Sequence, residues 1–155
     1  MILRILLISI AWVVIEIGSG YLTHLMPSRW FGQSGTLYRA LFRTRDWERG
    51  GRFYDRAFAV RRWKDRLPEA GDWFAGGMQK RLGLGTDRAY LERLAKETRR
   101  AELTHWLPVV LSATFFLWNP HYVAVWMPII GLLGNAPFII VQRYNRPRIE
   151  RAVER

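Results

Sequence analysis

Apolar and polar positions are separated into long blocks along this chain. The first block, residues 5–15, contains only apolar or small side chains, and it continues beyond Glu16 to about 20 residues in all. A helix of that length rises about 30 Å, which is enough for one crossing of a bilayer. The pattern predicts a transmembrane helix over residues 1–26, with a cleaved signal peptide as the alternative. A carboxyl group is costly in lipid, so Glu16 should face protein or be protonated.

Two further apolar blocks flank a turn signal, the Asn-Pro pair at residues 119–120. Residues 121–141 are long enough for a crossing, whereas residues 107–118 alone would rise only about 18 Å. Extending the shorter arm back to Leu103 gives about 24 Å of helix. We therefore expect a transmembrane hairpin over residues 103–142.

The region between the apolar blocks, residues 28–102, is rich in basic and aromatic side chains. It holds 18 Lys or Arg against 10 Asp or Glu, so the positive-inside rule places it in the cytoplasm. Basic and aromatic residues interleaved in this way are typical of amphipathic helices that lie in the membrane interface. Within this region, residues 69–84 are expected to form a short interfacial or re-entrant segment.

Charge and composition narrow the class of protein. The 155 residues carry a net charge of +11 and no cysteine, which excludes disulfides, thiolate metal sites and a cysteine nucleophile. Because the basic blocks lie beside apolar spans, they indicate contact with anionic lipid head groups and not with nucleic acid. We expect one all-α, polytopic membrane domain over residues 1–155, with about three transmembrane helices and a basic cytoplasmic tail over residues 143–155.

Polar side chains on the two arms of the hairpin should meet at one depth. If the turn acts as a mirror, residue i lies level with residue 239 − i, to within about one helical turn. His105 is then level with Asn135, at the boundary between charged and apolar positions. The polar residues brought to this level are Glu97, Arg100, Glu102 and His105 on the first arm and Asn135, Gln142, Arg143, Asn145 and Arg146 on the second.

This set of side chains suits acyl transfer. Imidazole is the usual general base near neutral pH, and Glu102, three residues before His105, is placed to orient it. Arg143, Arg146 and Asn135 suit an anionic donor or a developing oxyanion. A hydroxyl group that loses its proton to His105 would attack a thioester directly.

The carboxylates of the first arm allow other interpretations. Glu97 and Glu102 are both candidates for catalysis, but the alternative is that they simply neutralise Arg143 at a membrane boundary. The Glu-x-x-His pattern also occurs in di-iron helix bundles, which need a second copy and further carboxylates. This chain has one copy, so no metal site is expected.

A second basic group lies in the middle region. Arg61, Arg62 and Lys64 surround Trp63, and their charges suit the phosphates of a cosubstrate. The alternative is a patch that contacts lipid head groups. We expect no cofactor, and we expect acyl-CoA or acyl-carrier protein as the cosubstrate.

Three sequence blocks resemble the glycosyl-4,4'-diaponeurosporenoate acyltransferase family of small bacterial membrane proteins. They are VRRWKD at residues 60–65, ETRRAELTHW at residues 97–106 and NAPFIIVQRYNRPR at residues 135–148. The resemblance implies a multi-pass protein of the bacterial cell membrane, with most loops cytoplasmic. It also implies that the protein esterifies the C6 hydroxyl of a carotenoid-bound glucose with a fatty acyl group. Its partners would be membrane lipids, a lipid-linked sugar acceptor and an acyl thioester donor.

Two other functions stay open at this point. A small polytopic methyltransferase or reductase would use the arginine-rich ends of the hairpin to bind a nucleotide-like cofactor. Heat stabilisation by S-adenosylmethionine or NADPH, but not by acyl-CoA, would favour that function. A non-enzymatic protein would instead hold anionic lipid head groups, and reversing charges in the middle region would then matter more than losing His105.

Overall fold

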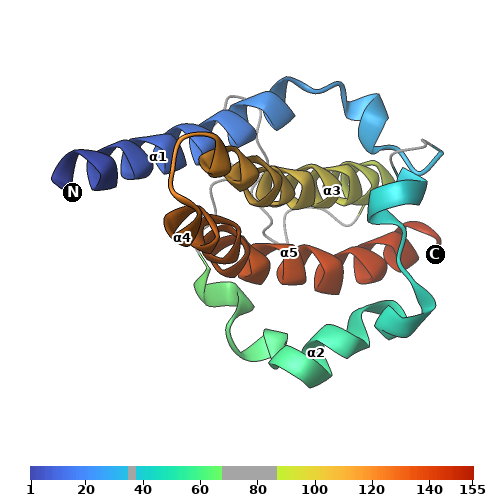
Figure 1. Ribbon diagram of the computed structural model, residues 1–155. Helices are drawn as coiled ribbons and strands as arrows, with labels where there is room; N and C mark the ends of the chain where they lie inside the picture. Colours follow the sequence, from blue (N-terminus) through green and yellow to red (C-terminus); the bar gives the residue numbers. More distant parts are fainter. Residues whose placement is uncertain (35–37, 68–86) are drawn as a thin grey trace.

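The computed structural model describes residues 1–34, 38–67 and 87–155, and these residues form helices and turns without a β-strand (Figure 1). Three helices are long, namely α1 (Ile2–Leu25), α3 (Arg88–Leu111) and α5 (Trp126–Val153). The short elements are η1 (Ser28–Phe31), η2 (Tyr38–Phe42), η3 (Asp46–Gly51), α2 (Arg52–Phe58), η4 (Val60–Arg62), η5 (Lys64–Arg66), η6 (Ser112–Leu117) and α4 (His121–Ala124). The all-α class that the apolar blocks predicted is confirmed for these residues.

α1 turns most of its apolar surface outward. Its buried side chains are Ser19 and Thr23, while Val14 and Ile17 are among its exposed apolar side chains. Exposed apolar surface of this extent is costly in water and is typical of a helix that faces lipid. The helix therefore has the surface that a membrane-spanning segment needs.

Among the described residues, two helices are long and apolar enough to cross a membrane, judged by length and composition. They are α1 and the helix His121–Val153, which joins α4 to α5, and both correspond to predicted spans. The third predicted crossing runs through α3, which carries charges up to Glu102 and gives way to the 3-10 turns of η6 at Ser112. The apolar part of this arm is therefore short, and its crossing of the membrane stays a prediction.

α3 lies between α1 and α5 and runs antiparallel to both (Figure 1). The three helices approach one another where Trp12 of α1 lies against Gly131 of α5. A Cβ atom at Gly131 would lie 2.8 Å from the Trp12 ring and 3.6 Å from the Cα atom of Val109 in α3. Trp12 also packs on Phe115, with ring centroids 5.3 Å apart. The missing side chain at Gly131 thus sets the distance between the helices.

The segment between the spans follows α5. η3 and α2 pack on α5, and a small core of Tyr54, Val60, Val141 and Tyr144 joins the two parts of the chain. Short helices occur in this segment, and their predicted position in the membrane interface stays a prediction. The segment expected at residues 69–84 lies outside the described residues.

Gly51 brings the junction of η3 and α2 against the backbone of α5. Its φ of +85° is left-handed, and a Cβ atom there would lie 2.7 Å from the Tyr144 carbonyl oxygen. We expect Gly51→Ala to lower the free energy of unfolding by at least about 2 kcal/mol, through backbone strain and overpacking.

Thermal unfolding in detergent measures this loss. Gly134→Ala is the matched control on α5, because nothing lies within 4 Å of a Cβ atom at that position and alanine favours a helix. Equal Tm values for the two variants would show that the close approach at Gly51 does not hold the two elements together.

Candidate active site

Three side chains from three helices form a hydrogen-bonded chain. His105 of α3 meets Asn135 of α5, with 2.8 Å between Nδ1 and Oδ1. The Nδ2 atom of Asn135 donates to Oε1 of Glu16 in α1 at 2.9 Å and to the Gly131 carbonyl oxygen at 3.0 Å. The contact between His105 and Asn135 agrees with the depth expected from mirroring the two arms. Glu16 is exposed on α1, so the expectation that it faces protein is met only by its hydrogen bond to Asn135.

The neighbours of Asn135 determine where His105 carries its proton. A backbone carbonyl only accepts hydrogen bonds, so the side of the amide that faces the Gly131 carbonyl, and with it Glu16, must be its NH2 group. The other side, Oδ1, is an acceptor, and Nδ1 of His105 must therefore donate to it. In a neutral imidazole this leaves the lone pair on Nε2. The hydrogen bonds from Glu16 through Asn135 to His105 thus make Nε2 of His105 the basic atom, as a general base requires.

The His105 ring is also held on its face. It stacks on Phe138 with ring centroids 4.5 Å apart and an angle of 14° between the planes. Asn135 is 4% exposed, which keeps its amide in place. A half-buried ring that is fixed by stacking and by a buried amide keeps one orientation, and fixed orientation is a large part of what an active site contributes.

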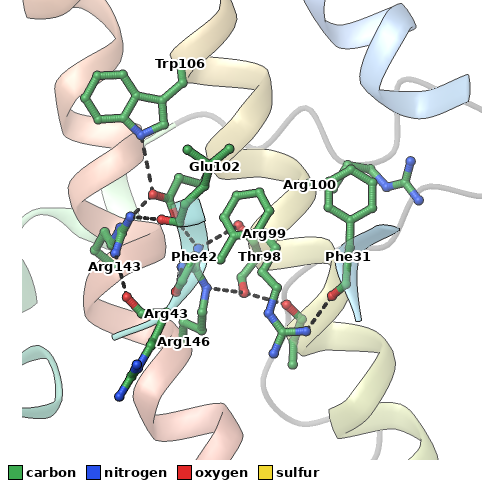
Figure 2. A network of polar contacts seen from close by, with 12 residues as sticks. Phe31, Phe42, Arg43, Thr98, Arg99, Arg100, Glu102, Trp106, Arg143 and Arg146 are labelled. Carbon is green, nitrogen blue, oxygen red and sulfur yellow. Dashed lines mark hydrogen bonds and ion pairs between the residues drawn. The ribbon is translucent and has the colours of Figure 1, made fainter. Parts of the chain in front are cut away.

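Glu102 belongs to a separate cluster of charges (Figure 2). It is 0% exposed, its Oε1 atom accepts from Nε of Arg143 at 2.6 Å, and its Oε2 atom pairs with Arg146. The orienting contact to His105 that was expected of Glu102 is made by Asn135 instead. The physical reason is that two long arginine side chains from α5 reach the carboxylate and engage both of its oxygens. Glu102 therefore pairs with positive charge between α3 and α5, which favours the alternative interpretation of the sequence, and its catalytic role stays a prediction.

A second buried carboxylate, Glu48 of η3, extends the cluster. Its Oε1 atom pairs with Nη1 of Arg143 at 3.2 Å and accepts from the backbone N–H of Arg45 at 2.9 Å, while Oε2 accepts from the Tyr54 hydroxyl at 3.2 Å. Burial and then the Glu48 carboxylate raise the pKa of Tyr54, so its phenol stays protonated and keeps donating. Glu48 was absent from the predicted site. The available signal was local, since it stands at the capping-box position after Arg45.

The other predicted polar residues of α5 differ in their accessibility. Arg146 is 1% exposed, and besides its ion pair it donates to Oγ1 of Thr98 at 3.4 Å. Gln142 is 4% exposed, and its Oε1 atom has no hydrogen-bond partner among the described residues. Asn145 is half-buried on the same helix. Substrate contacts by these residues stay predictions, and Arg143, with a side chain 17% exposed, is the more accessible arginine.

Arg100 caps the C-terminal end of α1. Its Nη1 atom donates to the carbonyl oxygens of His24 at 3.1 Å and Met26 at 3.0 Å, and also to that of Thr23. A cation at the last carbonyl groups satisfies their unpaired acceptors and interacts favourably with the helix dipole. Glu97 pairs with Nε of Arg100 at 3.3 Å and belongs to this cap. The catalytic role predicted for Glu97 and the substrate contact predicted for Arg100 stay predictions.

The basic group of the middle region lies on η4 and η5. Arg61 pairs with Asp55 at 2.6 Å, and Lys64 pairs with its chain neighbour at 2.5 Å. Desolvation acts to raise the pKa of Asp55, but hydrogen bonds and the charge of Arg61 lower it overall. Trp63 packs against the small core beside α5, while Arg61 and Arg62 are exposed. Contact with the phosphates of a cosubstrate fits this exposure and stays a prediction.

The described side chains offer proton transfer beside fixed positive charge. His105 supplies a basic nitrogen. Arg143 bonds Glu102, which lies one helical turn before His105 on α3. Across residues 1–34, 38–67 and 87–155, no three His, Asp or Glu side chains gather as ligands for a metal ion. His105 and Arg143 together suit general-base catalysis with electrostatic stabilisation.

Comparison with known proteins places the chain. The sequence model of the glycosyl-4,4'-diaponeurosporenoate acyltransferase family matches residues 38–155. Relatives of that name from Staphylococcus aureus strains bovine RF122 / ET3-1 and USA300 are each 29% identical over 141 residues, which cover 91% of this chain and 82% of the relative. No solved structure matches the chain. Since the family match covers well over half of its residues, the chain belongs to the glycosyl-4,4'-diaponeurosporenoate acyltransferase family, a family of acyltransferase enzymes.

Proposed function

We propose that the protein is a membrane O-acyltransferase that moves a fatty acyl group from a thioester to a hydroxyl group of a lipid-linked sugar. The observation that carries the proposal is the chain from Glu16 through Asn135 to His105, which leaves a basic nitrogen where charged and apolar positions meet. The relatives are named for a glycosyl carotenoid acceptor. A sugar C6 hydroxyl on a carotenoid or a similar glycolipid is therefore the acceptor we propose.

The reaction needs one base and one stabilised oxyanion. Nε2 of His105 takes the proton of the sugar hydroxyl while that oxygen forms a bond to the thioester carbonyl carbon. Asn135 accepts from Nδ1 and stabilises the imidazolium, and Glu16 holds the amide in the orientation that permits this. Arg143 bonds Glu102, one helical turn from His105 on α3, and its positive charge would favour the negative charge on the carbonyl oxygen. When the carbon–sulfur bond breaks, the imidazolium returns its proton to the thiolate.

The membrane arrangement follows from the same distribution of charge. In the proposed topology α1 crosses the bilayer of a bacterial cell, and α3 with η6 and α4 with α5 form the two arms of a hairpin. The basic segment over residues 28–102 lies in the cytoplasm, with short helices in the interface. The soluble cosubstrate, acyl-CoA or acyl-carrier protein, then reaches the site from the cytoplasm, where Arg61, Arg62 and Lys64 are suited to its phosphates.

Transfer by purified protein in lipid vesicles tests the function. Labelled acyl-CoA is supplied with glycosyl carotenoid or another glycolipid, and an ester on the sugar is the expected product. If no acyl thioester gives an ester with any hydroxyl acceptor, while S-adenosylmethionine or NADPH stabilises the protein against heat, the proposal is wrong.

Two substitutions of Glu16 test the hydrogen-bonded chain. Glu16→Gln keeps an acceptor for the Asn135 amide, so we expect transfer close to that of the unaltered protein. Glu16→Leu removes the acceptor, and we expect a loss of about tenfold in kcat, corresponding to about one hydrogen bond. Kinetics of both variants in vesicles measure this difference. A loss of equal size in both would mean that the charge of Glu16, and not its hydrogen bond to Asn135, is what matters.

A further inference from the structure

A cleft runs along α5 on the side that faces η3 and α2. Its volume is about 470 Å³, within the range of small-molecule sites. Its floor is formed by Leu132, Ala136, Ile139 and Ile140, whose spacing places them on one stripe of the helix. We call this hollow the α5 cleft.

The wall opposite α5 is aromatic. Trp47, Phe53 and Phe58 line it and remain exposed. Trp47 and Phe53 pack edge to face with ring centroids 5.1 Å apart, and Phe53 and Phe58 do so at 6.4 Å. These rings support one another and leave their outer surfaces to a ligand. A hollow between an aliphatic stripe and an aromatic wall suits a hydrocarbon chain.

The two ends of the α5 cleft differ in polarity. Leu132 marks the apolar end, and Arg143 and Arg45 mark the other, which lies about 16 Å farther along the helix. Glu48 is buried and engaged by Arg143 and Tyr54, while Arg45 is exposed. The polar end therefore presents positive charge, which complements an anionic head group.

We infer that the α5 cleft binds the acyl chain of the thioester donor, with its hydrocarbon end toward Leu132 and its phosphorylated carrier beside Arg45. The inference rests on the proposed function and names the donor subsite of the same site. The thioester then lies near Arg143, which bonds Glu102 one helical turn from His105. Trp106, the chain neighbour of His105, lines the same cleft.

Binding of non-hydrolysable acyl-CoA thioethers, from octanoyl to palmitoyl, tests the assignment. The protein is held in nanodiscs, and binding to nanodiscs without protein is subtracted. The unaltered protein should bind each longer chain more tightly, because each buried methylene group adds to affinity. Ala136→Phe fills the middle of the cleft and should weaken palmitoyl binding at least about tenfold, the loss of about two methylene contacts, with octanoyl binding retained. Leu132→Trp fills the far end and should affect only the longest chains.

Two comparisons separate this inference from its alternatives. Val14→Trp, on the exposed side of α1, should leave the whole series unchanged, and His105→Ala should bind every analogue as the unaltered protein does. If Ala136→Phe and Leu132→Trp leave the dependence on chain length unchanged, the assignment is overturned. The assignment is also overturned if a palmitoyl lysophospholipid competes as well as the thioether. The polar end of the cleft would then not distinguish a thioester donor from a membrane lipid. If the unaltered protein binds the thioethers as expected but transfers no acyl group, only the proposed function is contradicted.

Discussion

Replacing His105 with alanine should lower acyl transfer by about 10²- to 10⁴-fold while the protein stays folded in the membrane. That range is the usual contribution of a positioned general base. The imidazole is half-buried and makes a side-chain hydrogen bond to Asn135, so removing the imidazole leaves the Asn135 amide oxygen without that partner. The expected cost in unfolding free energy is about 1–3 kcal/mol. Single-turnover transfer in vesicles measures the rate without the steps of product release.

The matched control is His121→Ala. His121 is the first residue of α4, beside the turn of the hairpin, and it packs against Phe116. We expect transfer to be unchanged in that variant. The pH profile adds a second test, because the ascending limb that a base produces should disappear in His105→Ala. Full activity in His105→Ala, or an ascending limb that persists unchanged, would reject His105 as the base.

The depth of the site was predictable because a helical hairpin has simple geometry. Two antiparallel helices with the same rise bring residues equally far from the turn to one level. This rule paired His105 with Asn135 although 29 residues separate them along the chain. It did not depend on knowing how side chains pack, so it was available from the sequence alone.

The partners of the charged residues were not predictable in the same way. Arginine has a long, flexible side chain, and Arg143 reaches both Glu102 of α3 and Glu48 of η3. The depth of a residue along the hairpin does not determine which carboxylate such a long side chain engages. Glu48 lies in a basic segment whose path along α5 follows from tertiary packing, including the close approach at Gly51. Sequence periodicity contains no information about that path.

The role of α1 shows the same limit. The sequence marks Glu16 as a costly carboxyl group in an apolar span. The sequence does not say which side of the hairpin α1 packs against. The hydrogen-bond partner of Glu16 therefore could not be named from the sequence. Packing of Trp12 on Gly131 sets that position and brings Glu16 to Asn135, one helical turn farther along both helices. The hydrogen-bonded chain is thus a consequence of a glycine contact between apolar faces.

Replacing Glu102 with glutamine should destabilise the protein by about 3–5 kcal/mol, the cost of breaking a buried ion pair from one side. The carboxylate is 0% exposed, and Arg146, with 1% exposure, has no access to water that would replace it. A glutamine amide presents one acceptor and one donor, so its NH2 group would face an arginine that can only donate. Denaturant unfolding in detergent measures the free energy.

Glu97→Gln on the same helix is the control for this change. Its side chain is 25% exposed and its partner is three residues away, so we expect a change within about 1 kcal/mol. A second variant, Glu102→Leu with Arg146→Met, replaces this buried pair by apolar side chains while Arg143 stays paired with Glu48, and it should recover much of the stability. If Glu102→Gln unfolds no more readily than Glu97→Gln and still loses transfer, the ion-pair cluster is not what holds α3 to α5. Glu102 would then act on the reaction, as the spacing to His105 first indicated.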